Sequence, residues 1–175
     1  LADIVVTEAG FGSDLGAEKF MNIKARQGRF APSAVVIVAT IRALKMHGGV
    51  AKTDLQAENV EALKMGIENL AKHVDTVRTF GVEPVVALNR FVTDTEAELA
   101  AVLAWAKENG VRMARTNVWE EGGKGGIELA QQVLEAIEAP SKFNHLYDVE
   151  AKIEDKVQAI VQKVYGGANV QFTDN

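Results

Sequence analysis

The sequence predicts an α/β fold, with a mainly parallel sheet flanked by helices. Two unbroken apolar segments rich in β-branched residues, 34–38 and 84–89, are typical of strands buried on both faces of a parallel sheet. Longer segments with apolar residues every three or four positions, typical of amphipathic helices, alternate with them. Glycine or proline separates many of these segments. Strands that alternate with helices along the chain favour parallel pairing.

The first segment joins a predicted strand at residues 3–7 to a predicted helix at residues 15–26 through a glycine-rich turn. Three glycines surround Phe11 in this turn. Glycine allows a backbone to approach a ligand closely, so the turn is a candidate phosphate-binding loop. Its spacing, however, matches neither the dinucleotide-binding pattern nor the Walker A pattern. Two interpretations remain open: Phe11 fills the core at a tight turn, or it lines a substrate cleft.

Polar side chains follow the strand predicted at residues 34–38. Arg42, Lys45 and His47 come within nine residues of its carboxyl end. Ligands of open α/β sheets bind outside the carboxyl ends of the strands. These three residues are therefore candidates for lining a cleft, and the alternative is that they lie on the surface or between subunits.

The charge is unevenly distributed. The net charge is −5, yet residues 19–53 contain seven Lys or Arg and no Asp or Glu. Such a basic segment either steers an anion, for example a nucleotide phosphate or a folate carboxylate, or consists of solvated helix positions paired with acids elsewhere. No recognition motif accompanies the charge, which argues against nucleic acid as a partner.

Composition excludes several other classes of protein. Cys is absent, so there are no disulfides and no cysteine-ligated metals, and the three His show no zinc spacing. No segment reaches the length of a membrane span and no signal peptide is visible. We therefore expect a cytoplasmic protein that binds no metal through these residues and has no membrane partner.

The longest predicted helix covers residues 55–80 and ends at Gly81. Its apolar stripe marks it as scaffold, and His73 on it is expected at the surface. The change of composition after this helix is the predicted boundary between two segments, residues 1–80 and 81–175.

The third predicted strand ends in Asn89, again at a carboxyl end where ligands bind. Thr95 and Glu98 then match a capping box that starts the next helix, with Thr93 and Glu96 as an alternative register.

The rest of the chain alternates in the same way. The predicted elements are a strand at 111–116, helices at 127–138 and 149–165, a linker at 141–148 and the start of a strand at 169–172. Between the strand and the first of these helices lies a loop of four glycines around Lys124. It either cradles an anion at the helix N-terminus or acts as a mobile lid or hinge.

Three motifs carry a resemblance to a known family. They are Val-Ala-Thr-Ile-Arg-Ala-Leu-Lys-Met-His-Gly-Gly at residues 38–49, the glycine-rich segment at 6–20, and Asn-Arg-Phe with Thr-Asp-Thr-Glu-Ala-Glu at 89–98. Together they resemble formate–tetrahydrofolate ligases, in order along nearly the whole chain. Members of that family are much longer, so the chain resembles an internal piece. The implied fold is a portion like a P-loop NTPase and part of a neighbouring α/β domain.

The resemblance implies an ATP-dependent reaction of one-carbon metabolism. Formate is phosphorylated to formyl phosphate, and N10 of tetrahydrofolate attacks the formyl carbon to give 10-formyltetrahydrofolate. ATP and Mg²⁺ are the implied cofactors, in a homo-oligomeric parent enzyme. The P-loop pattern, Gly-x-x-x-x-Gly-Lys followed by Ser or Thr, is absent here. The phosphoryl-transfer centre is therefore expected outside this chain, which is expected to contain no catalytic residue and to be inactive alone.

The resemblance also implies roles for aromatic residues. Phe91 and Trp119 match positions that stack on the pterin of tetrahydrofolate, whereas an aromatic residue so placed, taken alone, is more often a core or hinge residue. Many members carry Pro where this chain has Val92. The candidates for lining the cleft are Phe11, Arg42, Lys45, His47 and Asn89, and Glu8 and Asp14 are either polar ligands or local caps. The alternatives are a stand-alone, non-catalytic module that binds an anion or nucleotide, and an oligomerisation module.

Overall fold

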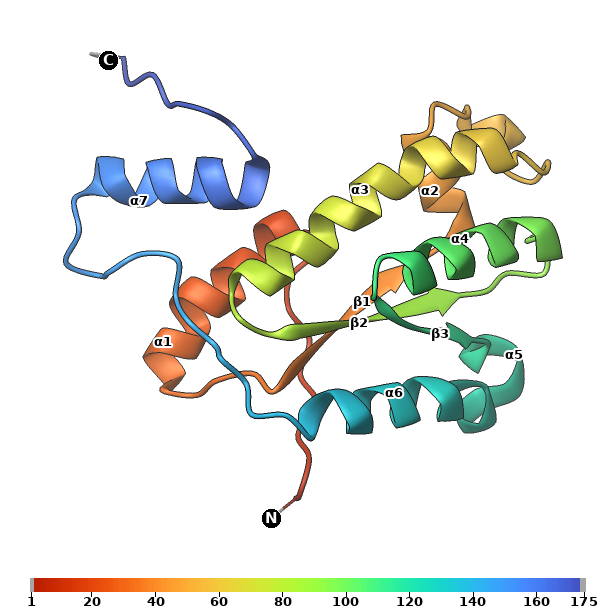
Figure 1. Ribbon diagram of the computed structural model, residues 1–175, viewed down its shortest axis with the longest axis horizontal. Helices are drawn as coiled ribbons and strands as arrows, with labels where there is room; N and C mark the ends of the chain where they lie inside the picture. The colour runs from red at the N-terminus through yellow and green to blue at the C-terminus, as the bar shows by residue number, and fades with distance from the viewer. Residues whose placement is uncertain (1, 174–175) are drawn as a thin grey trace.

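A three-stranded parallel sheet forms the centre of the fold in the computed structural model, which describes residues 2–173 (Figure 1). The strands β1 (Ala34–Ala39), β2 (Glu83–Asn89) and β3 (Arg112–Thr116) lie in that order across the sheet. Their register places Val36 opposite Val85 and Ala87 opposite Ala114. The predicted α/β fold with a parallel sheet is confirmed.

Helices cover both faces of this sheet. The helices α3 (Val60–Thr79) and α4 (Glu96–Glu108) lie on one face, and α6 (Ile127–Ile137) lies on the other (Figure 1). The short helix α2 (Ile41–His47) packs along α3. The main core lies between the sheet and α2, α3 and α4, and its residues with almost no exposed surface include Ile41, Leu63, Leu70, Val74, Val86, Leu88, Leu99 and Val102.

Local caps decide where two of the helices begin. The helix predicted from residue 55 begins at Val60, because the side chain of Asn59 accepts a hydrogen bond from the backbone N–H of Ala62 at 3.0 Å. Residues 55–59 form a turn and a loop instead, and they follow the 3₁₀ turn η3 (Lys52–Asp54). The capping box of Thr95 and Glu98 is confirmed at the start of α4.

The prediction of a strand at residues 3–7 is wrong. These residues form no regular structure, and Val5 and Val6 are 81% and 90% exposed. A strand needs a neighbour for its backbone hydrogen bonds, and this segment pairs with none of the three described strands. The strand predicted to begin at 169 is absent from residues 169–173. The helix predicted at 15–26 is longer than expected, since η1 (Gly12–Ala17), η2 (Phe20–Lys24) and α1 (Ala25–Gly28) join into one helical run.

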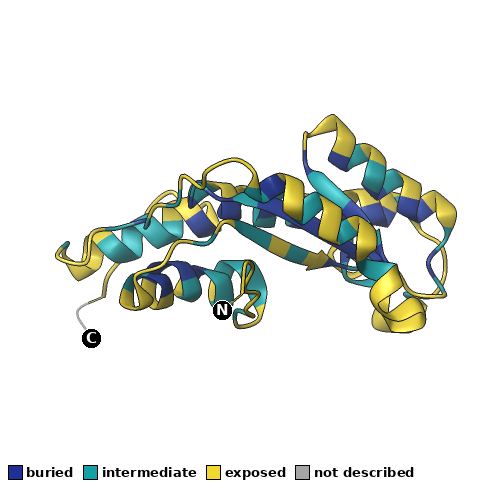
Figure 2. Ribbon diagram, turned by 90° about the horizontal axis from the view of Figure 1, so that it is seen from below, coloured by how far each residue is buried: buried dark blue, intermediate teal, exposed yellow. Residues whose placement is uncertain are grey.

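The strand β1 is less buried than its apolar sequence predicts. Val36 and Val38 are 43% and 67% exposed, because α6 covers their face of the sheet mainly over β2 and β3 (Figure 2). A groove of about 690 Å³ lies beside this edge, lined in part by Val36 and by Val133 and Ile137 of α6. The prediction that this strand is buried on both faces is therefore wrong.

The C-terminal part packs against the far end of α3. The helix α7 (Ile153–Ile160) continues into η5 (Val161–Tyr165), where Val164 joins a second core cluster with Val77, Phe80 and Leu146. The hydroxyl of Tyr165 donates a hydrogen bond to the backbone oxygen of Asp14 at 3.0 Å. Within residues 2–173, no helix is long and apolar enough to cross a membrane.

Candidate functional site

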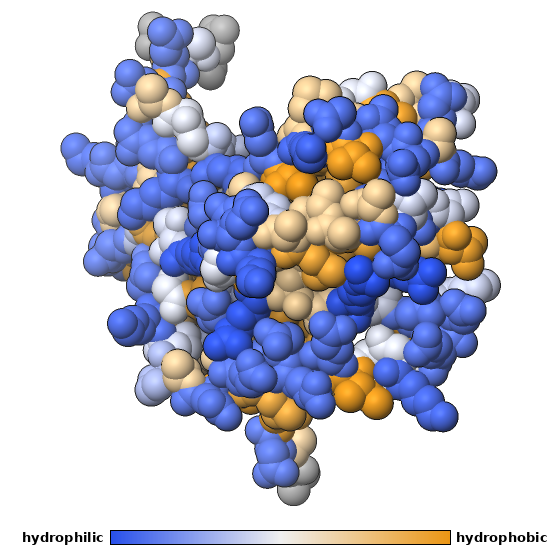
Figure 3. All heavy atoms as spheres, turned by 45° about the vertical axis from the view of Figure 1, so that its right-hand side comes forward, coloured by the Kyte–Doolittle hydropathy of each residue, from blue (hydrophilic) through white to orange (hydrophobic). Residues whose placement is uncertain are grey.

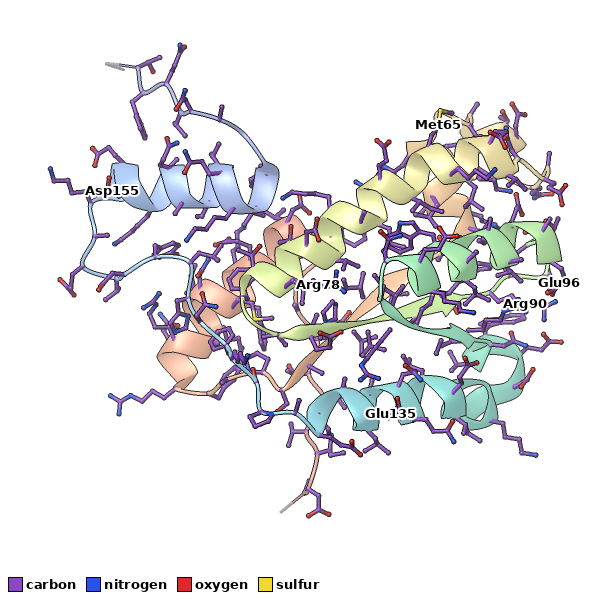
Figure 4. The ribbon with its side chains drawn as sticks, viewed as in Figure 1. Met65, Arg78, Arg90, Glu96, Glu135 and Asp155 are labelled. Atoms are coloured by element: carbon purple, nitrogen blue, oxygen red, sulfur yellow. The ribbon has the colours of Figure 1, made fainter. Side chains whose placement is uncertain are left out.

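The carboxyl edge of the sheet brings the two candidate pterin-stacking residues to one end of the molecule. Asn89 of β2 lies opposite Thr116 of β3, and the backbone N–H of Arg90 donates to the Thr116 oxygen at 3.0 Å. Phe91 comes two residues after the end of β2, and Trp119 comes three residues after the end of β3. Figure 4 labels Arg90 and Glu96 at this end of the sheet.

A tight turn holds Phe91. Its backbone N–H donates to Oδ2 of Asp94 at 2.8 Å, and the backbone N–H of Asp94 donates back to the Phe91 oxygen at 3.0 Å. The aromatic side chain is 37% exposed. Val92 is 81% exposed in the same turn. The turn thus presents Phe91 at the surface, with its backbone fixed.

Trp119 lies on α5 (Val118–Glu121) and is 89% exposed. The four-glycine segment after it is a 3₁₀ turn, η4 (Gly122–Gly126), which folds back so that the Asn117 N–H donates to the Gly125 oxygen at 3.0 Å. A Cβ atom on Gly125 would overlap the backbone of Asn117, so this return of the chain requires glycine. Figure 3 turns this end forward and shows apolar side chains bordered by hydrophilic ones.

The structure places Arg42 against Phe91. Thr40 caps α2 by accepting from the Ala43 N–H at 3.1 Å, and Arg42 therefore lies in the first turn of this helix. Its Nη2 donates to Oγ1 of Thr93 at 3.1 Å. Its Cζ lies 4.7 Å from the centroid of the Phe91 ring, within the range of a cation–π interaction. Of the candidates for lining the cleft, Arg42 is the one in contact with Phe91.

Lys45 has a different environment, since it is buried in an ion pair. Its Nζ lies 2.8 Å from Oε1 of Glu98 and donates to the Ala57 oxygen at 2.9 Å, and both charged side chains are at least 99% buried. Glu98 also accepts from the backbone N–H groups of Asn59 and Thr95. Burial alone raises the pKa of Glu98, but the hydrogen bonds from Lys45, Asn59 and Thr95 outweigh burial and hold the pKa below its ordinary value. The Lys45 ammonium is thus directed into the protein.

The other candidates lie apart from these contacts. Phe11 is 99% exposed at the start of η1, which excludes the interpretation that it fills the core. His47 is exposed at the end of α2, and Asn89 is half-buried at the end of β2. Glu8 is exposed in the N-terminal segment, and Asp14 is half-buried in η1.

Comparison with known proteins decides the family. The sequence profile described as formate–tetrahydrofolate ligase matches residues 1–175. The formate–tetrahydrofolate ligase of Staphylococcus carnosus (strain TM300) is 65% identical over 173 residues, which are 99% of this chain and 31% of the relative. That of Staphylococcus aureus (strain NCTC 8325 / PS 47) is 64% identical over the same shares. The chain belongs to the formate–tetrahydrofolate ligase family. It spans about a third of the length of these relatives.

The formate–tetrahydrofolate ligase motif Thr-Asp-Thr contains a site residue that sequence reasoning missed. Asp94 is 7% exposed, and burial raises its pKa above the ordinary value even though it accepts the Phe91 N–H. Its Oδ1 and the Nε of Arg42 are buried and have no hydrogen-bond partner within residues 2–173. The motif signalled Asp94 by its position after Phe91, but the sequence could not show that the side chain turns back into the protein.

The prediction that His73 lies at the surface is also wrong. The His73 ring is half-buried on α3 and its Nδ1 is hydrogen-bonded with the hydroxyl of Ser13. Burial lowers the pKa of His73, against the opposing effect of Asp14. Residues 2–173 contain no group of three or more His, Asp or Glu that could hold a metal ion.

Proposed function

We propose that this chain forms the pterin-binding wall of an enzyme that joins formate to tetrahydrofolate in one-carbon metabolism. The observation that carries the proposal is the placement of Phe91 and Trp119, at matched motif positions, on adjacent strand ends of one sheet edge. Both aromatic side chains are available to a ligand, being 37% and 89% exposed.

Stacking is the chemistry that these two residues supply. A pterin is a flat heterocycle, and aromatic side chains offer it a large contact area while losing little conformational freedom. Phe91 lies in a turn after β2 and Trp119 on the short helix α5 after β3, so the strands place both backbones before a ligand arrives. The proposed role of the chain is therefore to bind and orient tetrahydrofolate so that its N10 faces the formyl donor.

The phosphoryl chemistry of the proposed reaction is not assigned to this chain. Its sequence contains no Gly-x-x-x-x-Gly-Lys pattern followed by Ser or Thr, so the proposal places the ATP phosphates and Mg²⁺ on other parts of the longer enzyme. Formate and ATP are its proposed co-substrates, and we assign no catalytic residue among the 175. A homo-oligomeric, cytoplasmic enzyme completes the proposal, on the basis of family membership.

Fluorescence tests the pterin site directly. The chain has two Trp residues, and a Trp105→Phe variant retains Trp119 as its single reporter. Tetrahydrofolate should quench the fluorescence of this variant saturably, and free tryptophan corrects for absorption by the ligand. In a Trp119→Ala chain, Trp105 should show no saturable quenching. Equal quenching of the Trp105→Phe and Trp119→Ala chains contradicts the proposed site, and so does the absence of quenching in the Trp105→Phe chain.

Activity is tested in a chimaera. The matched 173 residues of this chain replace the corresponding segment of the S. carnosus ligase, and ATP-dependent formation of 10-formyltetrahydrofolate is measured. Phe91→Leu should raise KM for tetrahydrofolate by roughly tenfold with a smaller change in kcat, because it removes stacking from bound substrate. KM for ATP serves as the internal control and should stay unchanged. If the Phe91→Ala and Trp119→Ala variants of the chimaera each retain the original KM for tetrahydrofolate, the two residues do not stack on the pterin.

A further inference from the structure

One face of the Phe91 ring is covered by a cation. The guanidinium of Arg42 lies 4.7 Å from the ring centroid, and its Nη2 also donates to Thr93, two residues along the same turn. The carboxylate of Asp94 holds the Phe91 N–H at the end of that turn. The ring and its backbone are thus held from α2 on one side and from Asp94 within the turn.

We propose that Arg42 is a positioning residue of the pterin site, which occupies one face of Phe91 and leaves the opposite face for the ligand. This inference rests on the proposed function. An aromatic ring stacks through its two faces, and a guanidinium on one of them leaves a single stacking surface. The 37% exposure of Phe91, against 89% for Trp119, agrees with a ring covered on one side.

The polar groups around the ring indicate that the arrangement serves a site. The Nε of Arg42 and the Oδ1 of Asp94 are buried, and neither has a hydrogen-bond partner in the part of the chain that the structure describes. Buried polar atoms without partners destabilise the folded state and are rare in native proteins. Lys45 and Glu98 are the other charged groups near Asp94, and they are already paired with each other. Arg42 and Asp94 are therefore not arranged for maximum stability, whereas they do hold Phe91.

Restricting the Phe91 ring before a ligand arrives should strengthen binding of the ligand. A side chain whose conformation is already restricted loses less entropy when a ligand stacks on it. The contact between Arg42 and Phe91 joins residues 49 positions apart, so it also couples the first turn of α2 to the turn after β2. Removal of the guanidinium should leave the stacking residues present and weaken their alignment.

The test compares Arg42→Gln with a matched control, Arg78→Gln. Arg78 also donates one hydrogen bond from Nη2, to the Gly110 oxygen at 3.1 Å, but it lies on α3 away from Arg90 and Glu96 (Figure 4). Tetrahydrofolate binding is followed by Trp119 fluorescence in the Trp105→Phe background. We expect Arg42→Gln to weaken binding roughly tenfold and Arg78→Gln to leave it unchanged. Arg42→Lys keeps the charge and should restore part of the affinity.

A second measurement needs no ligand. The side-chain NMR signals of Arg42 in the unaltered chain should be shifted upfield by the Phe91 ring, and Phe91→Leu should abolish the shift. Equal signals in these two chains, or binding by Arg42→Gln as tight as in the unaltered chain, overturn the inference. Absence of binding by the unaltered chain overturns the proposed function instead, and the NMR shift then still upholds or overturns the Arg42 contact.

Discussion

At the scale of single residues, the buried pair of Lys45 and Glu98 changes the meaning of the basic segment at residues 19–53. Lys45 spans from α2 to α4 and also donates to Ala57. Arg26, in the same segment, donates to the backbone oxygen of Tyr147 at 2.7 Å. From the sequence, this basic segment either steers an anion or consists of solvated helix positions. The structure shows that some of its basic residues instead stabilise the tertiary structure.

We expect Lys45→Met to lower the free energy of unfolding by about 3 kcal/mol, because it leaves the Glu98 carboxylate buried without its cation. The matched control is Lys64→Met, which breaks the exposed pair with Glu61 at 3.1 Å. That change should cost less than about 0.5 kcal/mol. Urea unfolding followed by circular dichroism measures both variants. Similar losses in the two variants would show that burial of the pair is unimportant.

The same pair makes stability depend on pH. Because the pKa of Glu98 is below its ordinary value in the folded chain, its stabilisation is present above the pKa of an unfolded carboxyl group and is lost as the pH falls. From about pH 5 to about pH 3, the difference in unfolding free energy between the unaltered chain and Lys45→Met should therefore narrow. If this difference in unfolding free energy stays constant over that pH range, Lys45 does not stabilise the charged form of Glu98.

At the scale of elements, glycine sets how closely α2 and α3 pack. A Cβ atom on Gly66 of α3 would overlap the Leu44 carbonyl oxygen, and one on Gly48 would overlap that of Ala62. Since Gly66 of α3 lies against the backbone of α2, and Gly48 directly after α2 lies against the backbone of α3, the pair forms one close-packed unit. This unit carries Arg42 at one end and Lys45 within it.

Gly66→Ala should destabilise the chain by about 2 kcal/mol or more. Alanine favours a helix over glycine by roughly 1 kcal/mol, but the overlap with Leu44 forces α2 and α3 apart and outweighs that gain. Gly123→Ala is the control, because a Cβ atom there has no neighbour within 4 Å. Thermal unfolding should show a lowered midpoint for the first variant alone. Equal midpoints for Gly66→Ala and the unaltered chain would refute the close packing.

At the scale of the whole molecule, the two faces of the sheet are covered unequally. Val85 of β2 has no exposed surface, whereas Val38 of β1, on the same face, is 67% exposed. The reason is that α6 lies mainly over β2 and β3. Coverage by one helix, rather than strand composition, decides which apolar residues stabilise the fold.

Val85→Ala should lower the free energy of unfolding by about 2 kcal/mol, since it removes buried methyl groups and leaves a cavity. Val38→Ala makes the same chemical change on the same sheet face and should cost less than about 0.5 kcal/mol. Chemical unfolding of the two variants side by side measures the difference. Equal losses would mean that β1 is covered on this face in solution.

The elements of the fold were largely predictable because their signals are local. Helix periodicity, the Thr95 capping box and the apolar segment of β2 involve residues that lie close together in sequence, and all three are confirmed. The strand predicted at residues 3–7 failed because strand formation requires a distant partner. The candidate site was predictable in part: the motifs identified Phe91 and Trp119 as candidates, but they did not show that Arg42 covers the Phe91 ring.

The sequence by itself determined the α/β class, the three strands of the sheet, the helices α3, α4 and α6, and the motifs of the formate–tetrahydrofolate ligase family. Only the tertiary structure decided which polar groups are buried and what they contact. Lys45 meets Glu98 across 53 residues, Ser13 meets His73 across 60, and Arg42 meets Phe91 across 49. The local sequence pattern determines on which face of its helix or strand a side chain lies. Which residue that side chain contacts depends on how separate helices and strands pack in space.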